Sequence, residues 1–288
     1  MPPTHPPKTA YITGAASGIG LALATHLFAR GYVLALADLN HTSLQTHASH
    51  LHTTSPTHTP PNIYALDASS WSSQSSVFTQ AVANLGGRVD YVFAIAGVGE
   101  KRSLPNFGAE ATGEFVKPDG VCLDVDLYGV VWTVSLGVQQ MRRQAKDGEG
   151  WRGKIAVTAS VCGFYCVPTL PLYTAAKHGV IGLTRSYGTY LPEEFITLNA
   201  VCPNVVRTNI SSSDFYEKME AAGLLTPMSS VIEAFERFID GGMSGQCLEA
   251  GPKGNLVVRA PAEYLDRETE EIMGMLYERA HALHEPVT

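Results

Sequence analysis

The segment Thr13-Gly14-Ala15-Ala16-Ser17-Gly18-Ile19-Gly20 is a glycine-rich turn near the N-terminus. It joins a predicted strand at residues 9–13 to a predicted helix at residues 19–30. Glycine allows a tight turn and lets the backbone approach a pyrophosphate, which then rests on the helix N-terminus. The spacing GxxxGxG differs from the commonest dinucleotide fingerprint. The turn therefore predicts a dinucleotide site, with a plain strand-to-helix turn as the alternative.

The rest of the chain continues the alternation of strands and helices. Strands are predicted at residues 32–37, 63–66, 91–96, 155–159 and 196–201, and helices at residues 75–84, 120–141 and 175–190. This alternation is typical of parallel strands with helices on both faces of the sheet. We predict an α/β fold, a Rossmann-type doubly wound parallel sheet in a single domain at residues 9–260. Residues 41–61 hold five of the ten histidines, and we expect a solvated loop there rather than a metal site.

Bulk properties narrow the function classes. The 288 residues carry a formal net charge of −7 and no cluster of Lys and Arg, which argues against nucleic-acid binding. No apolar run reaches the roughly 18–20 residues needed to span a bilayer, so no membrane association is expected. Residues 1–8 are proline-rich, lack the order of a signal peptide and are predicted to be disordered. Five cysteines without a CxxC pair fit reduced thiols in a cytoplasmic protein.

Asp38 ends the second predicted strand and indicates which dinucleotide is bound. A carboxylate at this place can accept hydrogen bonds from both hydroxyls of the adenosine ribose, and it repels a 2′-phosphate. Ser17, Leu39 and Asn40 bring no positive charge to offset that repulsion. NAD is therefore favoured over NADP, with a helix-capping aspartate as the alternative.

Tyr173 and Lys177 stand four residues apart on a predicted helix, so their side chains lie on one face. A free tyrosine has a pKa of about 10 and is a poor base at neutral pH. A neighbouring cation lowers that pKa and makes proton exchange with an alcohol feasible. Ser160 follows the strand at residues 155–159, at the edge where α/β sheets place their ligands. The pair alone would fit a surface helix, but the three residues together predict a catalytic site.

These features together resemble the short-chain dehydrogenase/reductase family. The resemblance covers residues 9–251 and rests on the glycine-rich turn, Asp38, Asp67, the Ser160/Tyr173/Lys177 set and the segment Pro203-Asn204-Val205-Val206-Arg207-Thr208. It implies that Tyr173 is the general acid/base and that Ser160 hydrogen-bonds the substrate oxygen. Lys177 would hold the nicotinamide ribose and lower the pKa of Tyr173. The cofactor contacts that it implies are Gly14, Ser17, Gly18, Ile19, Gly20, Asp38, Asp67, Gly97, Tyr173, Lys177, Pro203, Val206 and Thr208.

The implied reaction is hydride transfer between NAD(H) and a secondary alcohol or ketone, coupled to proton exchange through Tyr173. Two alternatives remain open. One is a non-redox step on the same fold, such as a cyclisation, isomerisation or dehydration. The other is a dinucleotide-binding protein without turnover.

Two positions depart from the family pattern. Ile95 stands where the family usually has an asparagine whose amide ties neighbouring strands together. Asp126 stands where the family commonly has a catalytic asparagine that acts through its backbone carbonyl. Asp126 offers the same carbonyl, and its side chain adds a negative charge that could stabilise the Lys177 ammonium or disturb the proton relay. Both a tolerated replacement and an altered chemistry are consistent with this residue.

The substrate side is less defined by the sequence. Residues 208–230 are expected to form a substrate lid that includes Phe215, and Cys162, Phe164 and Tyr165 are expected to line the opposite wall. The aromatic content favours an apolar, moderately bulky small-molecule alcohol or ketone, with packing of the lid alone as the alternative role of these aromatic residues. By analogy with the family we expect a homodimer or homotetramer, paired partly through the helix that carries Lys177. Residues 261–288 are predicted to form a C-terminal extension whose amphipathic helix, residues 263–283, covers the site mouth or a partner subunit.

Overall fold

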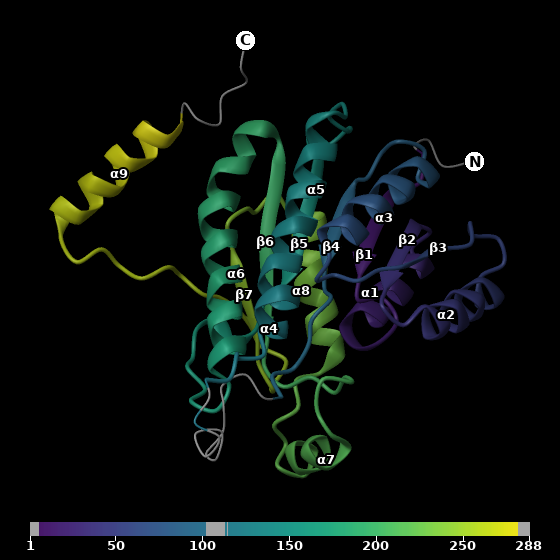
Figure 1. Ribbon diagram of the computed structural model, residues 1–288. Coiled ribbons are helices and arrows are strands. Elements are labelled where there is room, and N and C mark those ends of the chain that lie inside the picture. Colours follow the sequence, from purple (N-terminus) through teal and green to yellow (C-terminus); the bar gives the residue numbers. More distant parts are fainter. Residues whose placement is uncertain (1–5, 102–112, 114, 282–288) are drawn as a thin grey trace.

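The computed structural model describes residues 6–101, 113 and 115–281, and its centre is an eight-stranded sheet (Figure 1). The strand order is β3-β2-β1-β4-β5-β6-β7-β8, parallel throughout except for the antiparallel pair β7–β8. The strands are β1 (Thr9–Thr13), β2 (Val33–Asp38), β3 (Asn62–Ala65), β4 (Tyr91–Ala94), β5 (Gly153–Thr158), β6 (Ile196–Pro203), β7 (Cys247–Ala250) and β8 (Leu256–Val258).

Helices cover both faces of this sheet. The helices α1 (Gly18–Ala29), α2 (His41–Thr54) and α8 (Met228–Asp240) share one apolar core with the sheet. On the other face α3 (Trp71–Asn84), α5 (Val130–Arg142) and α6 (Pro171–Tyr190) share a second core. The predicted single-domain, doubly wound α/β fold is confirmed.

The central strands are buried on both faces, which explains why their sequences are continuous apolar runs. Successive side chains of a strand point to opposite faces. Tyr11 of β1 packs edge-on against Phe78 of α3, with ring centroids 5.1 Å apart, whereas its neighbour Ile12 belongs to the opposite core. Phe93 of β4 likewise meets Phe235 of α8 at 5.8 Å. Two cores therefore hold one sheet between them.

The expected loop at residues 41–61 is wrong, because its first two thirds form helix α2. Leu44, Ala48 and Leu51 recur at helical spacing and are buried, and they supply the apolar stripe that holds the helix on the sheet. The Asn40 side chain accepts a hydrogen bond from the Ser43 amide and caps the first turn. Serine, threonine and histidine on the outer face make the segment polar overall, so its composition did not indicate a helix.

The predicted helix at residues 120–141 is one continuous element with an irregular start. It runs through α4 (Val121–Leu123), a π-helical segment (Asp124–Gly129) and α5. Contrary to the sequence expectation, residues Val121–Arg142 are long and apolar enough to cross a membrane by length and composition. Val130, Val134, Val138 and Met141 are buried in the core, which accounts for that apolar character. A π-helical turn inside an α-helix frequently marks a functional position.

The C-terminal extension does not cover the site mouth of its own chain. Its helix α9 (Arg267–His281) has no buried residue and lies apart from the sheet, beyond α6 (Figure 1). Tyr277 and His281 contact Glu193, just after the C-terminal end of α6, whereas Tyr173 lies near the start of that helix. A helix of 20 residues spans about 30 Å, so α9 and the site lie far apart. Leu283 and residues 1–5 of the predicted disordered segment lie outside the described residues.

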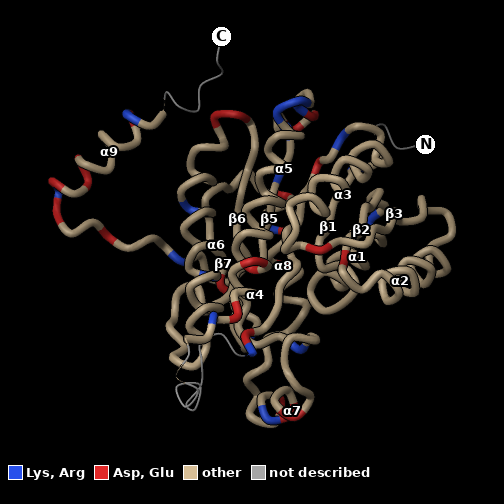
Figure 2. Tube along the Cα trace, viewed as in Figure 1, with Lys and Arg blue, Asp and Glu red and all other residues tan. Residues whose placement is uncertain are grey.

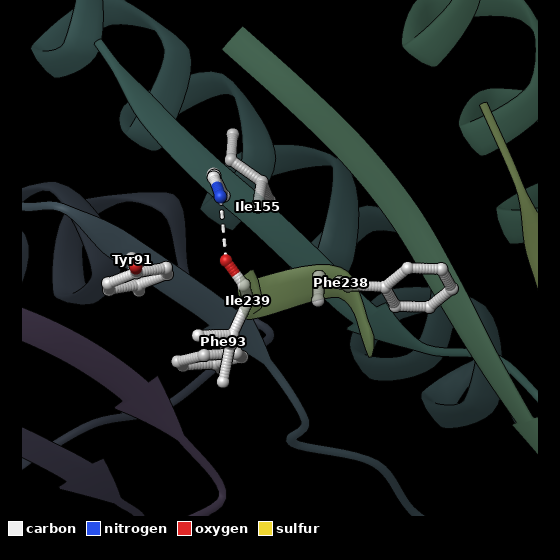
Figure 3. Close-up of a pocket in the computed structure, with 7 residues that line it drawn as sticks. Tyr91, Phe93, Ile155, Phe238 and Ile239 are labelled. Atoms are coloured by element: carbon white, nitrogen blue, oxygen red, sulfur yellow. Dashed lines mark hydrogen bonds between the residues drawn. The ribbon is translucent and has the colours of Figure 1, made fainter. Parts of the chain in front are cut away.

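The pocket drawn in Figure 3 lies between β4, β5 and α8, where helix α8 is attached to the sheet. Lys154 is buried there, and its ammonium donates to the carbonyl oxygens of Ile239 at 2.6 Å and Gly241 at 3.0 Å. These carbonyls end helix α8, where the helix dipole favours a cation. The surrounding side chains Tyr91, Phe93 and Phe238 are core residues. The lysine therefore anchors α8 to the sheet.

Helix α6 offers a paired test of its packing against β6. A Cβ at Gly188 would lie 2.5 Å from the Leu198 carbonyl oxygen, whereas a Cβ at Gly182 would meet nothing within 4 Å. Gly188→Ala should destabilise the protein by about 1–3 kcal/mol, because the backbone cannot give way without repacking. Gly182→Ala should stabilise it by up to about 1 kcal/mol through helix propensity. Chemical denaturation of both variants measures the difference, and equal stabilities would contradict the close approach of α6 to the sheet.

Candidate active site

The glycine-rich turn after β1 lies where the strand order of the sheet reverses, between β1 and β4. Such a switch point is where open α/β sheets bind ligands. Gly14 and Gly18 have φ angles of 69° and 51°, a backbone region that favours glycine. A Cβ at Gly20 would lie 2.1 Å from the Gly14 carbonyl oxygen. The motif therefore needs its glycines for both conformation and space.

The N-terminus of α1 fits a phosphate-bearing ligand. Ser17 is the N-cap residue, and its side chain makes no capping hydrogen bond. The amides of the first turn are thus not capped by that hydroxyl, and helix N-termini favour anions. Ile19 lies in the same turn, as expected from its place in the motif.

Asp38 lies at the carboxyl end of β2 beside this turn. Its two carboxylate oxygens accept hydrogen bonds from the Ala16 amide at 2.9 Å and the Asn40 amide at 2.8 Å. The carboxylate is thereby fixed in orientation, and each oxygen keeps a further acceptor site for a ribose hydroxyl. Asp67, shortly after β3, is exposed, and its carboxylate accepts from the amide and hydroxyl of Ser69. These two positions fit the adenosine half of a dinucleotide.

The segment after β4 closes against the turn. The Thr13 hydroxyl accepts hydrogen bonds from the amides of Ile95 and Ala96, and Ile95 packs against the core beneath α1 and α8. The packing of Ile95 and the hydrogen bonds to Thr13 thus stand in for the asparagine amide that the family usually has at this position. A Cβ at Gly97 would lie 2.7 Å from a carboxylate oxygen of Asp126, which brings the cofactor side and the catalytic side together.

The segment after β6 completes the cofactor side. Pro203 ends β6, Val206 is buried, and the Thr208 hydroxyl lies 3.1 Å from the phenol oxygen of Tyr216. A Cβ at Gly18 would lie 2.9 Å from the Thr208 methyl carbon. Thr208, in the segment after β6, therefore lies close to the glycine-rich turn that follows β1.

Ser160, Tyr173 and Lys177 meet at the carboxyl end of β5. Ser160 follows that strand, and its hydroxyl oxygen accepts from the Cys162 amide at 3.1 Å. The Ser160 side chain lies close enough to the Tyr173 phenol to lower its pKa. The Lys177 ammonium donates to the Thr158 carbonyl at 3.2 Å and lies 5.4 Å from the centre of the Tyr173 ring. Tyrosine, serine and lysine thus form one connected group.

Asp126 joins this group through the π-helical segment. Its carboxylate lies 3.0 Å from the Lys177 ammonium, and both side chains are buried. The same carboxylate accepts from the Val98 amide at 3.3 Å. Acidic residues flank both ends of α4 in Figure 2, and Asp126 is the one of them that reaches the buried lysine. The charge that the sequence placed within reach of Lys177 contacts it directly.

Burial and the ion pair shift the pKa of each group. Burial lowers the pKa of Lys177, but the Asp126 carboxylate and the Tyr173 phenol outweigh it, so that pKa is raised. Burial raises the pKa of Asp126, against the pull of Lys177. Burial also raises the pKa of Tyr173; Lys177 lowers it and Asp126 raises it. The carboxylate therefore opposes the effect of the lysine on the phenol.

The sequence profile of the short chain dehydrogenase family matches residues 8–218. The chain belongs to this family. Among its relatives is the short-chain dehydrogenase/reductase prx4 of Penicillium roqueforti, 34% identical over 226 residues. That match covers 77% of this chain but only 61% of the relative. The 15-hydroxyprostaglandin dehydrogenase (NAD(+)) of Rattus norvegicus is 31% identical over 234 residues, covering 80% of this chain and 79% of that protein.

Solved structures with this fold match most of the chain. Levodione reductase has a TM-score of 0.72 at 22% identity, covering 86% of this chain and 97% of that chain. The alcohol dehydrogenase of Thermococcus sibiricus, complexed with 5-hydroxy-NADP, has a TM-score of 0.69 at 23% identity and covers 90% and 100%. At these identities the likeness shows the fold alone. The family therefore rests on the sequence match, and the fold agrees with it.

The expected substrate residues are placed unevenly. Cys162 lies next to Ser160 and close enough to influence the Tyr173 phenol. Phe164 lies against the guanidinium groups of Arg185 and Arg259, at 5.6 and 5.7 Å, and packs on the core. These contacts indicate that Phe164 supports the wall of the expected substrate site.

Tyr165 and Phe215 are the more exposed of the expected substrate residues. The Tyr165 phenol donates to Glu249 of β7 at 3.2 Å. Phe215 lies in α7 (Ser213–Ala221), the helix of the expected lid, which extends beyond the sheet at the site end (Figure 1). Its neighbour Tyr216 is buried and anchors the helix through Thr208 and the Ser211 amide.

Sequence reasoning missed Glu100, which helps to position the helix that carries Tyr173 and Lys177. Its carboxylate accepts from the Tyr173 amide at 2.7 Å, in the first turn of α6, where a negative charge is favourable. Glu100 is the third residue after Gly97 in the chain, and no motif marks it. The residue is recognisable only once the fold brings the end of β4 next to α6. No group of three metal-ligating side chains occurs among the residues that the structure describes.

Proposed function

We propose that this protein catalyses the reversible transfer of a hydride between NAD(H) and a secondary alcohol or ketone. The observation that carries the proposal is the connected group of Ser160, Tyr173 and Lys177 beside the glycine-rich turn. A titratable phenol, a hydroxyl that can hold an oxygen and a buried cation are the parts that proton exchange with an alcohol requires. A binding protein without turnover has no need of such a group.

Each residue has a role that follows from its contacts. A bound dinucleotide would supply the hydride for reduction and accept it in oxidation. Tyr173 gives its phenolic proton to the carbonyl oxygen, and in oxidation the tyrosinate takes the proton back. Ser160 holds that oxygen beside Tyr173, because its side chain lies close to the phenol. Lys177 stabilises the tyrosinate and can hold a ribose hydroxyl.

The preference for NAD rests on Asp38. A 2′-phosphate would meet its fixed carboxylate, and the neighbouring Leu39 is exposed and uncharged. The relatives do not decide the choice, since one is named for NAD(+) and one solved structure is complexed with 5-hydroxy-NADP. The charge at this position is therefore the argument for NAD.

Substrate class, assembly and location complete the proposal. The exposed side chains of Tyr165 and Phe215 favour an apolar, moderately bulky small-molecule alcohol or ketone. The outward face of α6, with Ala175, His178 and Gly182, is suited to close contact with a second copy in a homodimer or homotetramer. Five free cysteines are consistent with a cytoplasmic location.

Tyr173→Phe tests the acid/base role. The variant keeps the ring but loses the phenol, so turnover should fall by roughly 10²–10⁴-fold while NADH still binds. Steady-state rates on the best substrate of a ketone and alcohol panel, with NADH binding followed by fluorescence, measure both. Tyr264→Phe removes an exposed phenol outside the site and is the control. Turnover near that of the unmodified protein in the Tyr173 variant would exclude this residue from the mechanism.

Asp38→Asn tests the cofactor preference, because it removes the charge and keeps the shape. The unmodified protein should bind NADH more tightly than NADPH by ~1–3 kcal/mol, the size of charge-assisted contacts. The variant should lose most of that difference, and adding Leu39→Arg at the exposed neighbour should reverse it. Calorimetric titration with both dinucleotides gives the values. Equal affinities in the unmodified protein would rule out the role given to Asp38.

A further inference from the structure

The ion pair between Asp126 and Lys177 is the buried charge pair at the centre of the site. The carboxylate is wholly buried and the lysine side chain is only 4% exposed, so neither charge is shared with solvent. Burying one charge without the other would cost several kcal/mol, which ties the two residues together. The π-helical segment that carries Asp126 turns it toward α6. Asp124, two residues earlier in the same segment, is exposed.

The pair changes the electrostatics of Tyr173. With a neutral residue at position 126, the phenol would sit beside an uncompensated ammonium, which favours its ionised form. With Asp126 present, the two opposite charges offset each other. Burial then dominates, and it favours the neutral phenol.

Other titratable groups near the pair do not replace this effect. The Cys122 thiol lies close to Asp126 and is neutral, because burial raises its pKa to about 12. The Glu100 carboxylate is engaged by the Tyr173 amide. The remaining groups that face the cluster are the thiol of Cys162 and, next to Cys122, the carboxylate of Asp119. None of these contacts the Lys177 ammonium among the ion pairs of the described residues.

We propose that Asp126 is a positioning residue that balances the charge of Lys177, keeps Tyr173 protonated near neutral pH and thereby sets the site to work as a ketone reductase. This inference rests on the proposed function and names its direction. In reduction the carbonyl oxygen takes the proton of the Tyr173 phenol, and the resulting tyrosinate regains a proton from solvent. Oxidation must begin from the tyrosinate, which the Asp126 charge disfavours.

Asp126→Asn tests the inference, because it removes the charge and leaves an oxygen that can accept from the Val98 amide. The ionisation of Tyr173 should move to lower pH by about one unit or more, since Thr158 and the tyrosinate still hold the ammonium. NMR of ring-labelled tyrosine measures it in the protein without dinucleotide, and Tyr173→Phe identifies the signal. The pH profile of kcat for oxidation should shift in the same direction, with an increase of about tenfold on its acidic limb for each unit.

Asp124→Asn is the matched control, since it removes the same charge from an exposed position of the same segment. Its titration and its pH profile should match those of the unmodified protein. Asp126→Ala removes the buried charge with a smaller side chain and serves if the asparagine variant does not fold. An unchanged titration of Tyr173 in the Asp126 variants would overturn the inference. A shift to higher pH would also overturn it, because Asp126 would then act mainly by keeping Lys177 charged.

The two proposals fail separately. If the unmodified protein oxidises and reduces no member of a substrate panel, the proposed function is wrong, whatever the titration of Tyr173 shows. If it turns over and the titration is insensitive to Asp126, only the role of Asp126 is wrong.

Discussion

The Lys177 ammonium is buried, and a buried cation must be matched by nearby acceptors. Three elements supply them: Thr158 at the end of β5, Asp126 in the π-helical segment and the ring of Tyr173 in α6. Strand β5, the π-helical segment before it and helix α6 after it therefore all contact this one charge. The glycine-rich turn is connected to the same point, because Gly97 touches Asp126 while Thr13 holds the neighbouring amides. Without this cation, Thr158, Asp126 and Tyr173 would have no shared charge that holds them together.

The residues around Ser160, Tyr173 and Lys177 also hold the surrounding elements in place. Glu100 accepts a hydrogen bond from the Tyr173 amide, so helix α6 is held at its start by a residue from the segment that follows β4. Arg185 and Arg259 support the Phe164 ring, and Glu249 receives the Tyr165 phenol. The wall of the substrate side is thus built on ionic and aromatic contacts between β7, β8 and α6. The lid helix α7, by contrast, is anchored by Tyr216 alone among the aromatic residues of its first turn.

Much of this arrangement could be predicted from the sequence, because parallel strands and YxxxK-type spacing leave strong local patterns. The strands β1 to β6 were expected close to their observed positions, and so was the meeting of Ser160, Tyr173 and Lys177 at one sheet edge. Helix α2 was missed because its apolar stripe is only three residues wide in a polar segment. Glu100 was missed because its role depends on a tertiary contact that no spacing records. The sign of the Asp126 effect on Tyr173 also needed the structure, since the sequence left open whether the charge supports the lysine or disturbs the proton relay. The C-terminal helix was expected, but its distance from the site follows from a linker whose direction has no local signal.

The central claim is that this site exchanges a hydride and a proton with a carbonyl compound. The most direct measurement is the absorbance of NADH on mixing the protein with a panel of apolar ketones, and of NAD+ with the matching secondary alcohols. The account predicts loss of NADH absorbance with at least one ketone near neutral pH, and slower formation of NADH from the corresponding alcohol at that pH. Tight binding of NADH with no change in absorbance across the panel would contradict the account, and would assign this fold and its catalytic group to a non-redox reaction.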